Sequence, residues 1–77
     1  MKAYDELIDF IAAGPSSEQL AAFKPSAETQ QRAWELVRKE KEESLPDDER
    51  HELEVFGQLE HFMRLIKARA RHHAQAA

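Results

Sequence analysis

The longest run of helical spacing fills the last third of the chain. Between Asp47 and His73, apolar residues recur every three or four positions and share about one third of the helix circumference at roughly 100° per residue. The residues on this stripe are Phe56, Leu59, Phe62, Met63, Ile66 and Ala70, with Val55 beside them. Polar side chains occupy the opposite side. The pattern predicts one long amphipathic helix that packs its stripe against the rest of the chain.

A first, shorter helix is predicted over residues 3–13. Gly14 and Pro15 end it, because glycine can adopt the left-handed cap conformation and proline cannot continue a helix. Four apolar residues share one face of this helix at the i, i+3, i+4, i+7 spacing. They are Tyr4, Leu7, Ile8 and Ile11.

Two further helices are predicted between the first and the last. Ser16 and Gln19 stand at capping-box spacing and indicate a short helix that continues to Phe23. Ser26 is suited to cap a third helix that runs from residue 27 to about residue 44, since its hydroxyl can accept an amide hydrogen bond from the first turn. Short connections favour antiparallel or steeply crossed neighbours.

These elements predict an all-α fold, a compact bundle of three main helices plus one short helix. We expect a single domain over residues 1–77, with residues 1–2 and 74–77 frayed. Phe10 lies off the face of the first helix and is expected to fill the gap toward the short one. The predicted core consists of Tyr4, Leu7, Ile8, Ile11, Leu20, Phe23, Trp34, Val37, Leu53, Phe56, Leu59, Phe62, Met63 and Ile66.

Composition narrows the class of protein. The chain contains no cysteine, which excludes disulfides and thiolate metal sites. No run approaches the roughly 20 apolar residues that span a bilayer. Asp5, Glu6 and Asp9 stand where a signal peptide would carry a basic start and an apolar stretch. We therefore expect a cytoplasmic protein.

The charge of the chain is unevenly distributed. The formal net charge of −4 does not favour general nucleic-acid binding. Residues 1–60 contain all 15 acidic side chains and seven basic ones, whereas residues 61–77 contain four basic side chains and no acidic one. Acids near the start of a helix and bases near its end also complement the helix dipole. The uneven distribution of charge along the chain therefore has two explanations, local helix chemistry or a charged partner.

Four histidines are the candidate metal ligands and proton carriers. Asp48 and His51 have the i, i+3 spacing that places two ligands on one helix face. Neither His51 nor His61 has a second histidine one turn away, and the adjacent His72 and His73 point about 100° apart. Paired carboxylates lie on charged helix faces, and no glycine-rich phosphate loop is present. We therefore expect no enzyme activity, no metal site and no cofactor.

Gly57 interrupts the long helix. A glycine in a helix interior costs about 1 kcal/mol relative to alanine, and this one projects away from the apolar stripe. Two explanations remain open. Either a neighbour approaches the backbone closely at Gly57, or glycine is merely tolerated there.

The basic end of the long helix is a candidate binding surface. Arg64, Lys67 and Arg71 share one side, where they could contact phosphates. Four positive charges without interleaved aromatic residues are a weak nucleic-acid footprint, however. The same side could instead bind the acidic segment 40–43, in its own chain or in a second copy. We therefore favour a protein as the partner of this surface over a nucleic acid.

Three stretches recur in a family of known proteins. Residues 8–14 read Ile-Asp-Phe-Ile-Ala-Ala-Gly, residues 23–26 read Phe-Lys-Pro-Ser, and residues 59–70 read Leu-Glu-His-Phe-Met-Arg-Leu-Ile-Lys-Ala-Arg-Ala. In these stretches the chain resembles small, largely uncharacterised bacterial helical proteins that are often encoded beside an HNH-type endonuclease. The resemblance extends over about residues 5–71. At Pro46 that family commonly has a serine or threonine cap, so we expect Asp47 to take the cap role here.

The resemblance implies a binding role without catalysis, as an accessory or antitoxin-like partner of an HNH-type nuclease. The acidic body could enter the basic cleft of a nuclease, and arginines could supply fixed hydrogen-bonding anchors. The polar positions of the closing motif are the predicted partner-binding residues. They are Glu60, His61, Arg64, Lys67 and Arg71.

Two alternative functions remain open. The first is a self-associating, homodimeric structural or regulatory module that uses leftover apolar surface from Trp34, Leu53 or Leu65. The second, less favoured alternative is a DNA-binding regulator that uses the basic end of the last helix.

Overall fold

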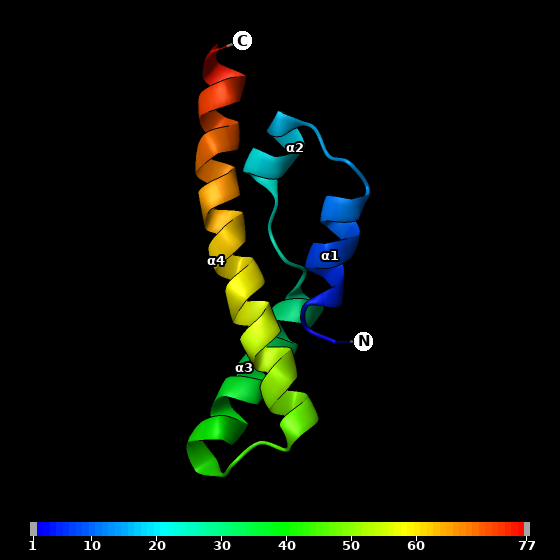
Figure 1. The fold of residues 1–77 in the computed structure, drawn as a ribbon, viewed down its shortest axis with the longest axis vertical. Coiled ribbons are helices and arrows are strands. Elements are labelled where there is room, and N and C mark those ends of the chain that lie inside the picture. Colours follow the sequence, from blue (N-terminus) through cyan, green and yellow to red (C-terminus); the bar gives the residue numbers. More distant parts are fainter. Residues whose placement is uncertain (1, 77) are drawn as a thin grey trace.

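The computed structural model describes the backbone of residues 2–76 and the side chains as far as His73. Four helices follow one another along the chain: α1 Asp5–Ala12, α2 Ser17–Ala22, α3 Ala27–Glu42 and α4 Asp47–Ala76 (Figure 1). No strand occurs in these residues. The predicted all-α fold of three main helices and one short helix is confirmed. Of the residues expected to fray, Met1 and Ala77 lie outside the described residues, and the helix continues through Ala76.

The predicted local signals act at the starts of α2 and α3 and at the end of α1. The Ser16 hydroxyl accepts a hydrogen bond of 3.1 Å from the Gln19 amide, and the Gln19 side chain accepts one of 2.9 Å from the Ser16 amide. Ser26 accepts from the Thr29 amide at 3.3 Å. Gly14 has a φ of 70°, the left-handed conformation that ends α1.

The start of α4 differs from the expectation. The Arg50 amide donates to the carbonyl of Pro46 at 2.9 Å, so Pro46 stands at the cap position and Asp47 is the first helical residue. The Asp47 carboxylate lies 3.7 Å from the Arg50 guanidinium. Asp47 therefore acts as a first-turn acid, together with Asp48 and Glu49, and complements the helix dipole without capping the helix.

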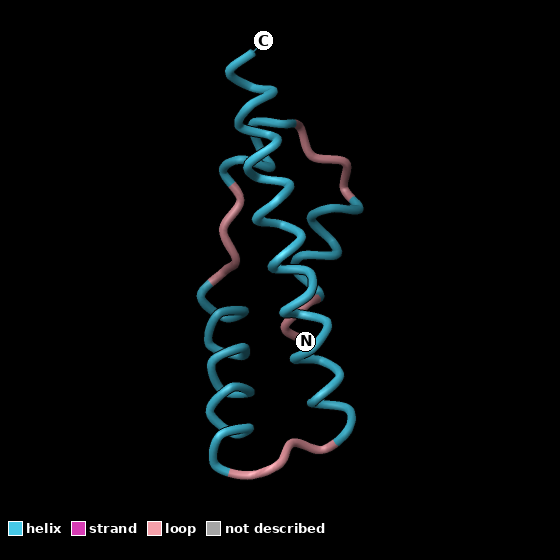
Figure 2. Tube along the Cα trace, turned by 60° about the vertical axis from the view of Figure 1, so that its left-hand side comes forward, coloured by secondary structure: helices cyan, strands magenta, loops and turns pink. Residues whose placement is uncertain are grey.

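Helix α4 runs the whole length of an elongated molecule that measures 48 × 20 × 19 Å. Helix α3 lies antiparallel beside the first half of α4, joined to it by a short turn, and α2 packs against the second half (Figures 1 and 2). The elongated shape arises because 30 residues of α4 extend about 45 Å at 1.5 Å per residue, which is longer than any of its partners.

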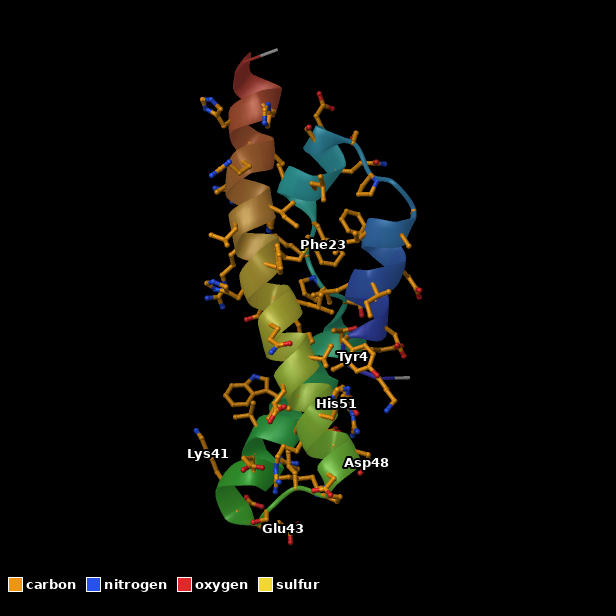
Figure 3. The ribbon with its side chains drawn as sticks, in the orientation of Figure 1. Tyr4, Phe23, Lys41, Glu43, Asp48 and His51 are labelled. Atoms are coloured by element: carbon orange, nitrogen blue, oxygen red, sulfur yellow. The ribbon has the colours of Figure 1, made fainter. Side chains whose placement is uncertain are left out.

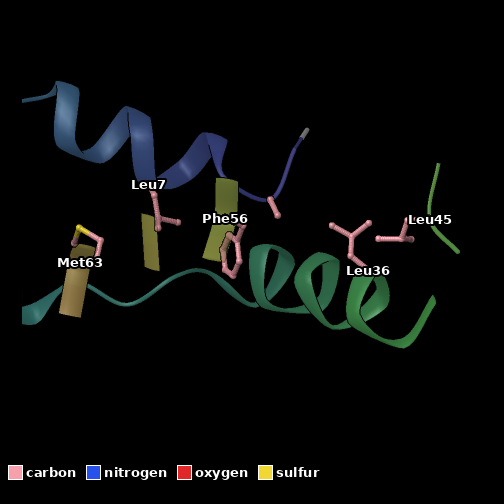
Figure 4. Close-up of a cluster of buried hydrophobic side chains, with 6 residues drawn as sticks. Leu7, Leu36, Leu45, Phe56 and Met63 are labelled. Atoms are coloured by element: carbon pink, nitrogen blue, oxygen red, sulfur yellow. The ribbon is translucent and has the colours of Figure 1, made fainter. Parts of the chain in front are cut away.

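The core is a narrow strip along α4. Leu7 and Leu36 are its fully buried large side chains. Figure 4 shows how side chains from α1, α3, α4 and the α3–α4 turn form one row. The row consists of Ala3, Leu7, Leu36, Leu45, Phe56 and Met63. Phe10 stacks on Phe23 with 4.2 Å between ring centroids, which confirms the predicted contact between α1 and the end of α2.

Several residues of the predicted core are exposed. Trp34 is 68% exposed and Phe62 62%, and Ile8 and Ile11 also lie at the surface. In α3, Leu36 faces the core, and a residue two positions earlier points about 160° away at 100° per residue. In α4, Phe62 lies about 100° from the buried Met63, on a flank that the six-residue α2 does not cover. The prediction was therefore wrong at these four positions, and it omitted Leu36.

We expect Leu36→Ala to lower the free energy of unfolding by about 2–5 kcal/mol, because it empties a fully buried site. Phe62→Ala should cost well under half of that, since its ring is largely in water already. Urea denaturation followed by circular dichroism measures both values. Equal losses for the two variants would contradict the assignment of Leu36 to the core and of Phe62 to the surface.

Candidate interaction surface

Among the residues whose side chains the structure describes, one charged group is strongly buried, and its role is structural. Glu52 is 3% exposed and accepts hydrogen bonds from the Ala3 amide at 2.8 Å and from Nε and Nη2 of Arg32 at 2.9 and 3.0 Å. This carboxylate joins the start of the chain, α3 and α4. These hydrogen-bond donors satisfy both carboxylate oxygens of Glu52, so the site offers no free acid or base for catalysis.

Hydrogen bonding sets the ionisation of Glu52. The bond from Arg32 lowers the pKa of Glu52 most, and the amide of Ala3 lowers it further against the opposing effect of burial. Sequence reasoning missed this residue, although a signal exists. Glu52 precedes Phe56 by four residues and Met63 by eleven, which places an acidic residue on the buried stripe of α4.

Because the pKa of Glu52 is lowered on folding, its contribution to stability is complete above the ordinary glutamate pKa of about 4.3 and is lost as the pH falls through the folded value. Glu52→Gln should therefore cost about 1–3 kcal/mol at neutral pH and reduce the loss of stability on acidification. The exposed Glu54→Gln is the matched control. Thermal unfolding between pH 3 and 7 tests this, and parallel pH profiles for wild type and Glu52→Gln would contradict it.

The histidines do not assemble into a site. His51, His61, His72 and His73 are all exposed on α4. Figure 3 shows His51 and Asp48, the one predicted pair of metal-ligand spacing, near the start of that helix. Among the described residues, no group of three potential ligands comes together.

Four of the five predicted partner-binding residues form a ridge on α4. Glu60, Arg64, Lys67 and Arg71 follow the i, i+4, i+7, i+11 spacing of one helix side, and His61 lies beside the ridge. The ion pair predicted at i, i+4 is present, with Glu60 and Arg64 2.8 Å apart. His61, Arg64 and Arg71 are exposed and accessible to a partner.

Lys67 has an internal role that the sequence analysis did not foresee. Its ammonium donates a 2.7 Å hydrogen bond to the carbonyl of Phe23, the cap residue directly after α2. Pairing with this carbonyl satisfies an acceptor that the end of a helix leaves open. Lys67 therefore fastens α2 to α4, and it is half-buried rather than free on the surface.

Two apolar grooves flank α4. The first, which we call the Trp34 groove, lies between α3 and α4, has a volume of about 400 Å³ and is lined by Trp34, Val37, Leu53 and Gly57 among others. The second, the Phe62 groove, lies between α2 and α4, measures about 380 Å³ and is lined by Leu20, Phe62, Leu65, Ile66 and Arg69 among others. Sequence reasoning named several of these side chains but assigned Trp34 and Phe62 to the core.

Charge is separated along the molecule. Glu40, Glu42 and Glu43, together with Asp47 and Asp48, are exposed around the α3–α4 turn and form what we call the acidic tip. Figure 3 shows Lys41 and Glu43 at the end of the molecule farthest from the C-terminus. Arg64, Arg69 and Arg71 of α4 lie toward the opposite end, whereas Arg50 stays beside Asp47 at the tip. The basic side of α4 therefore cannot bind segment 40–43 of its own chain, and of the two predicted arrangements only contact with another copy remains.

Comparison of the chain with known protein families, curated proteins and solved structures gives no match. In the described residues, no helix combines the length and the apolar composition needed to cross a membrane. The resemblance to proteins encoded beside HNH-type nucleases stays a prediction.

Proposed function

We propose that this bacterial protein acts by binding another protein and catalyses no reaction itself. An HNH-type nuclease is the first client to test, with this chain as its accessory or antitoxin-like partner in the cytoplasm. The observation that carries the proposal is the 62% exposure of Phe62 at the mouth of the Phe62 groove. Exposed apolar patches of this kind mark protein-interaction sites in soluble domains.

The surroundings of Phe62 have the composition of an interaction site. Arg69 and His73 line the groove together with Phe62, whereas Arg64, two positions after Phe62, points about 160° away from it. Aromatic residues and arginine are the side chains most enriched at the energetic centre of protein interfaces. An aromatic anchor surrounded by polar and cationic groups therefore favours a protein as the occupant of this side of α4.

The acidic tip supports a client with a basic surface. It carries five acidic side chains and one lysine within residues 40–48. The DNA-binding cleft of a nuclease must be positive to hold phosphates, and complementary charge accelerates the encounter of two proteins. Occupation of that cleft by the acidic tip would block DNA physically.

DNA is the second candidate ligand, and two contacts weigh against it. Arg64 is paired with Glu60, and the ammonium of Lys67 is held by the carbonyl of Phe23. Two of the three cations of the predicted phosphate-binding side are thus engaged within the chain. The remaining footprint is small for a protein with a net charge of −4.

Phe62→Ser should weaken client binding by about 30-fold or more, the loss expected on removing a hot-spot aromatic residue. Ile8→Ser is the matched control, because Ile8 is an exposed apolar residue on α1, on another element of the molecule. Co-purification of the nuclease with the tagged protein, followed by calorimetry, measures the effect. The proposal would be falsified if the two purified proteins formed no complex at micromolar concentration.

The acidic tip should act mainly on the association rate. Glu42→Gln with Glu43→Gln should slow association about tenfold at low salt and have less effect at high salt. Asp9→Asn with Glu18→Gln changes the net charge equally at exposed sites on α1 and α2 and serves as control. Surface plasmon resonance at two salt concentrations measures the rates. Equal slowing by both double variants would show that only net charge matters.

A further inference from the structure

The packing of the described residues does not explain Gly57. A Cβ atom built on this residue meets no heavy atom within 4 Å, so the fold does not require glycine at this position. Glycine nevertheless weakens a helix interior. Close approach by a neighbour within the described chain is excluded. Mere tolerance of glycine and close approach by another molecule remain, and the surroundings of Gly57 bear on the second.

The position of Gly57 shows what such a molecule would meet. Gly57 lines the Trp34 groove with Val37 and Leu53, and Trp34 forms a wall that is 68% exposed. The missing side chain leaves the backbone of α4 accessible at this point. The groove therefore suits an aliphatic side chain carried by a helix that can approach α4 closely.

Leu65 is a side chain of that kind on the outer side of α4, at the edge of the Phe62 groove. It is 56% exposed and lies two helical turns beyond Gly57, with His61 midway between them. At 100° per residue, Gly57, His61 and Leu65 fall within about 80° of one another on the outer side of α4. Within one chain Leu65 cannot fill the Trp34 groove, because eight residues of helix separate it from Gly57 by about 12 Å.

We propose that a second copy of this chain occupies the Trp34 groove, in an antiparallel two-fold dimer along the outer side of α4. With the two-fold axis at His61, Leu65 of each copy lies over Gly57 of the other. A symmetric dimer repeats each contact, so both grooves are filled by one arrangement. This inference does not depend on the nuclease, although Leu65 also lines the Phe62 groove that is assigned to the client.

Charge supports this orientation. In the same register, Glu54 of one copy falls between Arg64 and Arg71 of the other, and the basic end of each copy lies along the acidic half of its neighbour. A parallel arrangement would instead bring basic ends together. In a single chain, Glu54 and Arg71 are 17 residues apart on one helix, or about 25 Å, too far to interact appreciably in salt.

The available surface is large enough. A stable interface buries about 800 Å² on each partner, roughly one seventh of the 5662 Å² exposed by this molecule. One long side of a body of 48 × 20 Å offers an area of that order. Trp34 adds the type of residue that concentrates binding energy at interface centres.

Gly57→Leu separates dimerisation from folding. The substitution should raise the melting temperature of the monomer by about 4 °C through better helix propensity, and it should weaken the dimer at least tenfold by filling the groove. Sedimentation equilibrium on the full chain measures the second effect, with Ile8→Ser, an exposed apolar position on α1, as a control that leaves the dimer intact. A wild-type monomer at millimolar concentration, or a Gly57→Leu dimer of unchanged affinity, overturns the proposal.

A charge exchange tests the orientation. Glu54→Arg and Arg71→Glu should each weaken the dimer several-fold, and the double variant should recover most of the loss. Recovery supports the antiparallel contact, because the two positions do not meet within one chain. If the double variant instead loses as much dimer affinity as the two single variants together, the antiparallel contact is wrong. A third outcome separates this inference from the proposed function. If the wild-type protein is monomeric and Gly57→Leu weakens nuclease binding, the Trp34 groove binds the client. The proposed dimer is then wrong, whereas the proposed function stands.

Discussion

The carboxylate of Glu52 is the contact on which the arrangement of the helices depends. A charged group in a narrow core is tolerated only when hydrogen bonds replace the water that it loses, and here the Ala3 amide and the Arg32 guanidinium provide them. Because these ligands come from the N-terminal segment and from α3, one residue of α4 fixes both elements. It also determines which side of α3 faces inward and hence which side chains remain outside.

The exposed aromatic residues follow from that arrangement. With Arg32 and Leu36 directed at α4 and the core, Trp34 must face solvent beside Gly57. At the other end, Lys67 ties the end of α2 to α4, and the short α2 covers Ile66 and Ala70 but not Phe62. Two grooves on opposite flanks of one long helix are therefore a consequence of having too few side chains to cover it. A protein with such a surface is suited to holding two partners, and we assign one groove to a client and the other to a second copy.

The sequence predicts the helices well, because caps, breakers and apolar spacing are local properties. The capping box at Ser16, the left-handed Gly14 and the α4 stripe through Phe56 and Met63 were all predictable. The side of α3 that faces the core could not be predicted. One apolar side of this helix contains Leu36, and another, equally apolar in the sequence, contains Ala33, Trp34 and Val37. Tertiary contacts decide between them, chiefly the bond between Arg32 and Glu52. The role of Lys67 was hidden for the same reason, since its acceptor is a backbone carbonyl 44 residues away.

The central claim is that the outer surface of a preformed helical domain binds other proteins without rearranging its core. Amide NMR spectra of the isotope-labelled protein, recorded first at increasing protein concentration and then with added nuclease, test it most directly. The account predicts shifts that grow along the outer side of α4 between Glu54 and Arg71 on self-association, and around Phe62 and the acidic tip with the client, while the amides of Leu36 and Glu52 stay fixed. Spectra that do not change in either titration, or shifts centred on the core, would contradict it.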